Sequence, residues 1–192
     1  VVSVWDPTDT EWQLHGKQTL HPGGCSYTAI SGIWQTAWLE PVPKSHVEKL
    51  QVRTDIERGI LYLTLFARTV PMPLKIQAVV KDGNKEIARV SGNIGEALIP
   101  QIRKNLVDFF NATSIQVSTE LEIPIKDPKT WTPDSPFLYD LEISIQDDSE
   151  KNLDTVSSYF AMRSVKLGHD TDGNARLFLN GKPILMTGAL DQ

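Results

Sequence analysis

Short segments in which apolar and polar residues alternate make up most of this chain. In residues 59–67 (Gly-Ile-Leu-Tyr-Leu-Thr-Leu-Phe-Ala), every second residue from Leu61 onward is a leucine or an alanine. Side chains of a β-strand point alternately to its two faces, so this pattern predicts a strand with one buried face. About seven such segments, separated by turn residues, fall between Val47 and Leu167. We therefore predict an all-β fold, an immunoglobulin-like antiparallel β-sandwich.

Two dipeptides between apolar runs predict tight hairpins: Asp-Gly at residues 82–83 and Asn-Gly at residues 180–181. Asn-Gly is the stronger signal, because both central residues of the favoured turn need positive φ. The second arm of the later hairpin, residues 182–186, has the composition of a strand that is buried on at least one face. We therefore expect the element that covers it to lie beyond Gln192.

One segment inside the predicted sandwich departs from the alternation. Residues 99–110 place Ile102, Leu106 and Phe109 near helical spacing, but the segment is short and is flanked by glycines and a proline. We interpret it as an inserted loop with one helical turn.

Residues 1–43 form a second departure, with four of the five tryptophans and several Gly and Pro residues. The proline pair Pro41 and Pro43 is typical of a linker, so we interpret the preceding residues as the end of an upstream β-domain. We expect tryptophans such as Trp34 and Trp38 to fill a sheet interior, where each buries on the order of 200 Å². The alternative is a platform on which a sugar ring stacks.

Composition and charge narrow the class of protein. Hydrophobic residues make up 40% and charged residues 22% of the chain, as in ordinary globular proteins, which argues against a disordered or fibrous chain. A net charge of -5 without a basic stripe argues against nucleic acid and anionic membranes as partners. No apolar run approaches the ~20 residues of a membrane span. Cys25 is the single cysteine and cannot form an internal disulfide, which leaves the compartment open.

The carboxylates offer little catalytic chemistry. Glu120 and Glu122 lie on one face of a predicted strand, ~7 Å apart, which is within the range of the carboxylate pairs that hydrolyse glycosides. Charges on the solvent face of a strand are far commoner, and we prefer that interpretation. Elbow motifs of hydrolases and phosphate-binding glycine loops are absent from the sequence. We predict no catalytic residue and no cofactor within this chain.

A metal site is not expected either. Asp170, Asp172 and Asn174 have the spacing of the first three ligands of a calcium loop, but Ala175 and Gly181 stand where that loop needs a glycine and a closing glutamate. A turn between two strands prefers the same residue types. We interpret the segment as a turn.

Four segments, taken in order, resemble glycoside hydrolase family 2. They are residues 31–41 (Ser-Gly-Ile-Trp-Gln-Thr-Ala-Trp-Leu-Glu-Pro), 131–139 (Trp-Thr-Pro-Asp-Ser-Pro-Phe-Leu-Tyr), 159–163 (Tyr-Phe-Ala-Met-Arg) and 178–184 (Phe-Leu-Asn-Gly-Lys-Pro-Ile). The family includes β-galactosidases, β-glucuronidases and β-mannosidases. The resemblance implies a sugar-binding jelly-roll domain, then an immunoglobulin-like sandwich, then a (β/α)8 barrel that carries the acid/base and nucleophile glutamates.

By this resemblance, residues 1–43 are the remnant of the jelly roll, residues 44–167 the sandwich, and residues 168–192 the start of the truncated barrel. Both catalytic glutamates would then lie beyond Gln192. A retaining mechanism needs two carboxyl groups ~5 Å apart. We therefore expect this chain to be an inactive part of an enzyme that hydrolyses terminal β-linked sugars, meeting its oligosaccharide or glycoside substrate through other domains. An oligomeric parent is compatible with this expectation.

The resemblance also implies roles for particular residues. The loop that contains His21, Cys25, Ser26 and Tyr27 would approach the substrate pocket as an edge contact; the alternative is an ordinary turn. The family's β-galactosidases carry an acidic residue shortly before the Ser-Gly-Ile motif, and residues 25–30 contain none, which argues against that strict subtype. Arg163 would bridge the sandwich and the barrel.

Two further functional hypotheses stay open from the sequence. The chain would be a free-standing carbohydrate-binding or adhesion module if it binds sugars alone. It would be a purely structural surface domain if the reading frame ends near Gln192.

Overall fold

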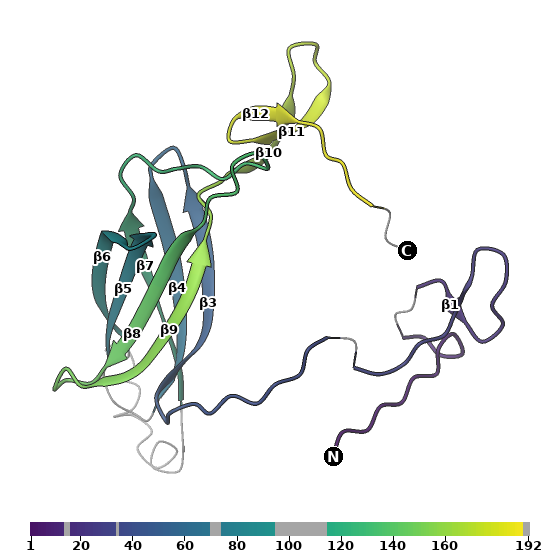
Figure 1. Cartoon of the computed structure of the whole chain (residues 1–192), viewed down its shortest axis with the longest axis horizontal. Helices are drawn as coiled ribbons and strands as arrows, with labels where there is room; N and C mark the ends of the chain where they lie inside the picture. Colours follow the sequence, from purple (N-terminus) through teal and green to yellow (C-terminus); the bar gives the residue numbers. More distant parts are fainter. Residues whose placement is uncertain (14–15, 34, 70–73, 95–114, 190–192) are drawn as a thin grey trace, which may run out of the picture. The chain divides into compact units, whose positions relative to one another are not determined.

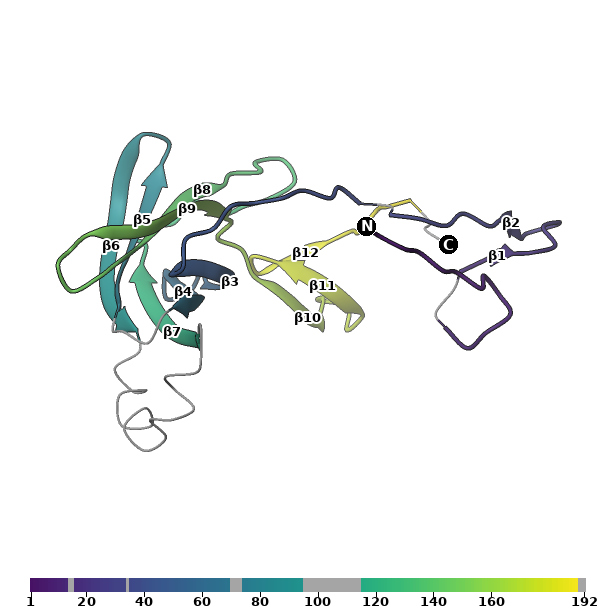
Figure 2. The ribbon, with the colours of Figure 1, turned by 90° about the horizontal axis from the view of Figure 1, so that it is seen from below.

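The computed structural model describes residues 1–13, 16–33, 35–69, 74–94 and 115–189, and strands are its only regular elements there. Seven of them form two antiparallel sheets (Figures 1 and 2). The first sheet has the order β3-β4-β7, with β3 at His46–Asp55, β4 at Ile60–Thr69 and β7 at Ile115–Pro124. The second has the order β6-β5-β8-β9, with β5 at Leu74–Asp82, β6 at Lys85–Ile94, β8 at Tyr139–Gln146 and β9 at Asn152–Phe160.

The core lies between these two sheets, which Figure 2 shows as separate layers. Alternate residues of the central strands fill it, namely Leu61, Leu63 and Leu65 of β4, Ile76, Ala78 and Val80 of β5, and Leu141, Ile143 and Ile145 of β8. Burying each leucine or isoleucine stabilises the fold by about 1.5–3 kcal/mol. The predicted immunoglobulin-like antiparallel β-sandwich is confirmed. Three strands face four, because β6 pairs with β5 in the second sheet.

The two predicted hairpins are confirmed, with one correction of detail. At the Asn-Gly turn, Leu179 pairs with Lys182, and both Asn180 (φ 50°) and Gly181 (φ 78°) have positive φ, as a type I′ turn requires. At the earlier hairpin, Asp82 pairs with Lys85, so the central residues are Gly83 and Asn84 and not Asp-Gly. Only Gly83 has positive φ there, which suits the glycine-first type II′ turn.

A small antiparallel sheet follows the sandwich, in the order β10-β11-β12, with β10 at Val165–His169, β11 at Ala175–Leu179 and β12 at Lys182–Ile184. Asn180 joins it to the sandwich: its Oδ1 accepts the N–H of Ser164 at 2.9 Å, and its Nδ2 donates to the carbonyl oxygen of Trp131 at 2.9 Å. Leu177 of β11 is exposed, and so are residues 185–186 beyond β12, as expected for a hairpin that is not covered within this chain. The covering element beyond Gln192 stays a prediction.

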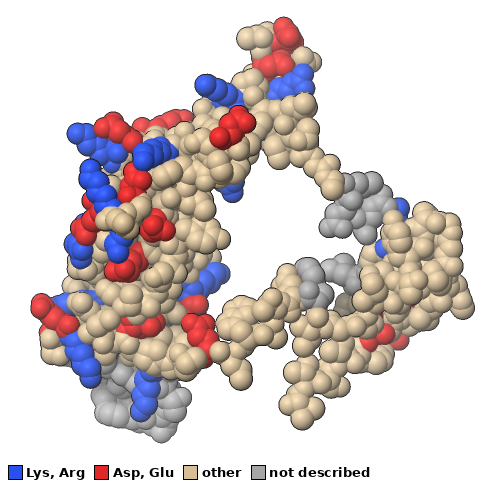
Figure 3. Space-filling model, viewed as in Figure 1, with Lys and Arg blue, Asp and Glu red and all other residues tan. Residues whose placement is uncertain are grey.

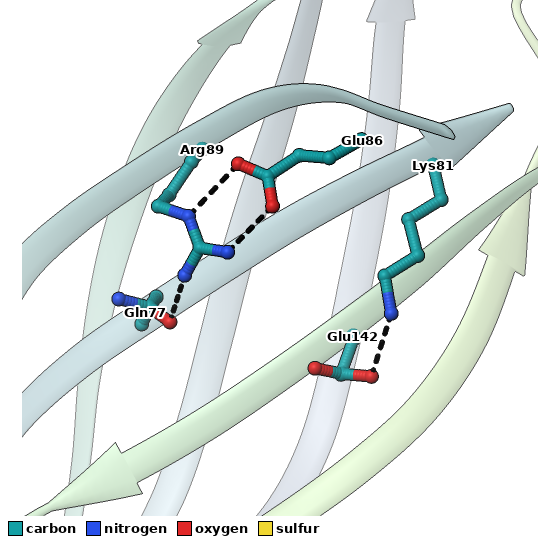
Figure 4. A network of polar contacts seen from close by, with 5 residues as sticks. All are labelled: Gln77, Lys81, Glu86, Arg89 and Glu142. Carbon is teal, nitrogen blue, oxygen red and sulfur yellow. Dashed lines mark hydrogen bonds and ion pairs between the residues drawn. The ribbon is translucent and has the colours of Figure 1, made fainter. Parts of the chain in front are cut away.

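The outer faces of the sandwich carry charges of both signs, interspersed on the face seen in Figure 3. On the second sheet, both carboxylate oxygens of Glu86 accept from Arg89, which also donates to Gln77, and Lys81 lies 3.0 Å from Glu142 (Figure 4). Arg89 of β6 and Glu142 of β8 are the cross-strand partners of Val79, a residue on this outer face of β5 that is almost fully buried.

Residues 1–41 belong with residues 187–192 to one compact unit, and residues 42–186 form the other. In the described part of the first unit, the one regular element is a parallel pair of two-residue strands, β1 at Gln18–Thr19 and β2 at Tyr27–Thr28. Trp38 is 74% exposed, so the expectation that it fills a sheet interior is wrong, because no strand forms around it. Trp34 and the predicted helical turn at 99–110 lie outside the described residues.

No described helix is long and apolar enough to cross a membrane.

Candidate functional site

The four loop residues assigned to a substrate edge all lie between or beside β1 and β2. His21 follows β1, and its N–H donates to Oγ1 of Thr19 at 3.1 Å. The N–H of Ser26 donates to the carbonyl oxygen of Gly23 at 3.0 Å, which closes a turn, and Cys25 is a free, exposed thiol within it. Tyr27 begins β2 with its ring exposed. The structure therefore places these residues on one surface loop, and their contact with substrate stays a prediction.

Arg163 lies in the other unit, where it lines a hollow of about 650 Å³ that we call the groove. The groove is bordered by the end of β3, the end of β9, the 131–138 loop and the start of β10. Its lining consists of Val52, Arg53, Thr54, Trp131, Leu138, Tyr159, Phe160, Ala161, Arg163, Ser164, Val165 and Lys166.

A network of hydrogen bonds holds the walls of the groove together. The N–H of Trp131 donates to the carbonyl oxygen of Met162 at 2.9 Å. This bond fixes the 131–138 loop, which we call the tryptophan loop, against the end of β9. Oγ1 of Thr54 donates to the carbonyl oxygen of Arg163 at 2.9 Å, which ties β3 to the same segment. The guanidinium of Arg163 then lies over the indole ring of Trp131, 5.1 Å from its centroid, in the geometry of a cation–π contact.

The groove is lined by three cations, Arg53, Arg163 and Lys166, and by no carboxylate. Lys166 is paired outside the lining with Glu57, whose Oε1 lies 2.7 Å from its Nζ, and this hydrogen bond raises the pKa of the Lys166 ammonium. Among the described residues, Arg163 makes no ion pair. Arg53 likewise has no carboxylate partner there and stacks on the ring of Tyr62 at 3.8 Å from its centroid. The groove can therefore hold a carboxylate, and no carboxylate of its own stands in its lining as the acid/base or nucleophile of glycoside hydrolysis.

The carboxylates singled out from the sequence are exposed or make hydrogen bonds that stabilise strands and turns. Glu120 and Glu122 are exposed on the outer face of β7, where Oε2 of Glu120 accepts from Oγ1 of Thr64 at 3.3 Å. Asp170 accepts the N–H of Asn174 at 2.8 Å and the Nε–H of Arg176 at 3.0 Å, and these bonds lower the pKa of its carboxyl. That geometry closes the turn between β10 and β11. Within the described ranges, no group of three or more His, Cys, Asp or Glu side chains is arranged to hold a metal ion.

Sequence reasoning found Arg163 and Trp131 but not their contact, and it missed Thr54 and Tyr159 as neighbours. Trp131, Tyr159 and Arg163 all lie in the motifs described above, which were the available signal. Thr54 lies outside the motifs on β3, and only the packing of its sheet against the sheet of β9 brings it to the groove.

Comparison with known proteins places these observations in a family. A family model described as glycosyl hydrolases family 2 matches residues 45–163. A β-galactosidase of Alteromonas mediterranea is 25% identical over 162 residues, and a putative β-glucuronidase of Formosa agariphila is 25% identical over 165 residues. Each match covers 83% of this chain, but the chain spans only 14% and 17% of these relatives.

A solved structure agrees with the fold. A family 2 glycosyl hydrolase of Bacteroides cellulosilyticus superimposes with a TM-score of 0.51 at 18% identity, over 73% of this chain and 18% of that one. The residues matched by the family model run from the residue before β3 to Arg163, which is the whole sandwich and the segment that closes the groove. Because this match covers well over half of the sequence, the chain belongs to glycosyl hydrolases family 2.

Proposed function

We propose that this chain is a non-catalytic part of a longer family 2 glycosidase, which hydrolyses terminal β-linked sugars by a retaining double displacement. The observation that carries the proposal is the match of the family model to the sandwich, residues 45–163, together with the β-galactosidase relatives of which the chain spans about one seventh. In this proposal, residues 1–43 end a jelly-roll domain and residues 168–192 begin the catalytic barrel.

The sandwich would act as a rigid spacer between those domains. Retaining hydrolysis requires two carboxyl groups ~5 Å apart on a fixed frame, one as acid/base and one as nucleophile. Described carboxylates of the sandwich are instead held in ion pairs, as Glu48 is with Arg68 at 2.8 Å, accept backbone N–H groups, as Asp154 does from Val47 at 2.9 Å, or are exposed on the outer faces, as Glu122 is. The catalytic pair would therefore be supplied from outside this chain.

The test is an assay of purified protein with nitrophenyl β-galactoside and nitrophenyl β-glucuronide. We expect no hydrolysis above buffer from the 192-residue chain and steady turnover from the longer polypeptide that contains it. Heat-inactivated longer polypeptide serves as the control for contaminating enzyme. Turnover that rises in proportion to the concentration of the 192-residue chain, and that stays with it through a second column, would refute the non-catalytic role.

A carbohydrate-binding module is the second candidate, favoured by one observation in residues 1–41. Trp5 and Trp12 are 79% and 94% exposed and line a hollow with Asp6, whose carboxylate accepts from Oγ of Ser31 at 2.6 Å. Exposed indole rings beside a carboxylate are a suitable platform for a sugar ring. Calorimetry of the chain with galactose and cellobiose tests this candidate: a module would release heat that Trp12→Ala abolishes, whereas a spacer would release none.

A further inference from the structure

Asn180-Gly181 is the one Asn-Gly pair in the sequence, and it carries chemistry that its place in a hairpin turn does not use. The backbone nitrogen that follows an asparagine can attack the carbon of the side-chain amide, which closes a succinimide ring and expels ammonia. Glycine hinders this attack least, because it has no Cβ. Every other asparagine of the sequence is followed by Lys, Ile, Leu or Ala.

Hydrogen bonds hold the side-chain amide of Asn180 away from this reaction. Its Oδ1 accepts the N–H of Ser164 at 2.9 Å, and its Nδ2 donates to the carbonyl oxygen of Trp131 at 2.9 Å. The backbone N–H of Asn180 also donates to the carbonyl oxygen of Ser164 at 2.9 Å. Both ends of the amide are therefore anchored, and its carbon can turn onto the nitrogen of Gly181 only after the bonds to Ser164 and Trp131 break.

The hairpin that carries Asn180 can open without the sandwich. Among the described strands, β12 pairs with β11 alone, and it has three residues (Figure 1). Asn180 is half-buried and Gly181 is exposed, so water reaches the turn. Short hairpins with solvent-exposed backbone bonds open at a small fraction of the free energy of global unfolding. Such an opening frees the amide while the two sheets of the sandwich stay packed.

The products of the reaction cannot make the contacts of Asn180. Water opens the succinimide at either of its carbonyl groups and leaves an aspartate, or an isoaspartate whose main chain is one carbon longer. A carboxylate has no N–H to donate, so the carbonyl oxygen of Trp131 loses its donor and faces an oxygen instead. A partly buried acceptor without a donor is destabilising. The N–H of Ser164 can still be accepted, so the loss falls on the tryptophan loop.

We propose that Asn180 is a site of spontaneous deamidation that its bonds to Ser164 and Trp131 hold in check. When the hairpin opens, the nitrogen of Gly181 displaces ammonia from the Asn180 amide, and water then converts the succinimide to aspartate or isoaspartate. The modified residue no longer anchors the tryptophan loop to the small sheet. This inference is independent of the proposed function, because it needs no other domain and no substrate.

Peptide mapping by mass spectrometry tests the site in the 192-residue chain, kept in mildly alkaline buffer with and without denaturing urea. We expect Asn180 to convert roughly tenfold to a hundredfold more slowly in the folded chain than in urea, because two hydrogen bonds have to break first. This comparison uses the wild type alone, so it does not depend on a variant that fails to fold. Equal rates in the two conditions, or no conversion of Asn180 in urea, would overturn the proposal.

Lys85→Gly supplies a matched control, because it places a glycine after Asn84 in the other hairpin turn. The side chain of Asn84 is exposed and makes no hydrogen bond to the described residues. In this variant, folding should therefore slow the conversion of Asn84 much less than that of Asn180. Equal slowing at the two residues would overturn the proposal, since any folded turn would then protect as well as the bonds to Ser164 and Trp131.

Asn180→Asp tests the consequence, because aspartate is one of the two products. Hydrogen exchange should become faster at residues 129–132 in this variant, since the carbonyl oxygen of Trp131 loses its donor. Asn84→Asp makes the same change of charge in the other hairpin turn and should leave residues 129–132 unchanged. Exchange in β4 should stay slow in both variants, which separates a local effect from misfolding. Equal exchange at residues 129–132 in Asn180→Asp and the wild type would overturn the proposed effect on the tryptophan loop.

Discussion

The hydroxyl group of Tyr139 connects the start of β8 to a segment ten residues upstream. Its oxygen accepts the N–H of Lys129 at 2.8 Å, while its ring, only 2% exposed, stacks on Phe160 and meets Phe137 edge to face. A tyrosine near the start of the sixth strand that bonds back to the upstream backbone is the tyrosine corner of immunoglobulin-like domains. The packing of the ring and the hydrogen bond can be separated by one substitution.

We expect Tyr139→Phe to lower the free energy of unfolding by about 1–3 kcal/mol, because the N–H of Lys129 loses its acceptor in a partly buried place while the ring packing is kept. Urea unfolding of both proteins measures the change. Tyr159→Phe is the matched control on an exposed ring and should change stability by less than about 0.5 kcal/mol. Equal effects of the two substitutions would show that the Tyr139 bond adds nothing.

Two glycines with nearly the same backbone conformation separate conformational strain from steric contact. Gly59 has φ +63° and Gly83 has φ +59°, but a Cβ at Gly59 would lie 2.7 Å from the carbonyl oxygen of Ile125, whereas one at Gly83 would meet nothing within 4 Å. We expect Gly83→Ala to destabilise the chain by about 1–2 kcal/mol, which is the cost of the left-handed conformation alone.

Gly59→Ala should cost more than Gly83→Ala, because it must also displace the turn between β3 and β4 from Ile125. The hydrogen bond from the N–H of Ile125 to the carbonyl oxygen of Gly59, 2.7 Å long, would be disturbed as well. Thermal unfolding of the two variants side by side gives the difference. A smaller loss at residue 59 than at residue 83 would contradict the close approach seen here.

At the scale of the elements, local pattern was sufficient to predict the strands, and insufficient to predict their partners. Alternation in β4 and β8 identifies the buried face, and Asn180-Gly181 identifies a turn, because both depend on neighbouring residues in the chain. That β7 pairs with β4, across the intervening β5 and β6, depends on contacts distant in sequence. Alternation also fails at Val79, which is almost fully buried although it lies on the outer face of β5, between its cross-strand partners Arg89 and Glu142.

The ion pair on β6 predicts how stability depends on pH. Bonding to Arg89 lowers the pKa of the Glu86 carboxyl below its usual 4.5, so the unfolded chain takes up this proton first as the pH falls. The stabilisation by Glu86 is therefore fully present above about pH 4.5 and is lost as the pH falls through the lower, folded-state pKa. We expect the contribution of the Glu86–Arg89 pair to the free energy of unfolding to be small at any pH, because both side chains are partly exposed and water screens the pair.

Urea unfolding of the wild type and Glu86→Gln from pH 2.5 to 7 should give a difference in stability that shrinks on the acid side. The same comparison in an Arg89→Gln background removes the partner, and the pH dependence of the difference should disappear there. A difference that grows as the pH falls would contradict the assignment of the lowered pKa to this pair.

At the scale of the whole molecule, the groove shows that motifs can identify the residues of a site and still not predict that these residues lie together. Trp131, Tyr159 and Arg163 all lie in motifs, yet the groove that they line also includes Thr54 of β3, which belongs to the other sheet and lies in no motif. No local sequence pattern predicts that the edge strands β3 and β9 of the two sheets lie side by side. The loop with His21 and Tyr27 is simpler, because its residues are close in sequence and one short turn brings them together.

The two compact units also differ in what they contribute to stability. All the buried hydrophobic residues of the described structure belong to residues 42–186, from Leu61 to Met162. In residues 1–41, Thr8 is the one described residue that is fully buried, and Trp5, Trp12 and Trp38 are exposed. A segment of about 40 residues is near the lower limit for a core of its own, so this one adds little to the free energy of folding.

Deletion of residues 1–41 should therefore leave the sandwich folded. We expect the remaining chain to unfold in urea in one transition, with a free energy within about 0.5 kcal/mol of the 192-residue protein, because no core residue is removed. Deletion of residues 165–192 is the informative comparison: it removes Asn180, which bonds to Ser164 and Trp131, so it should loosen the tryptophan loop and speed hydrogen exchange at residues 129–132. A large loss of stability from the first deletion would contradict the expectation that the sandwich folds without residues 1–41.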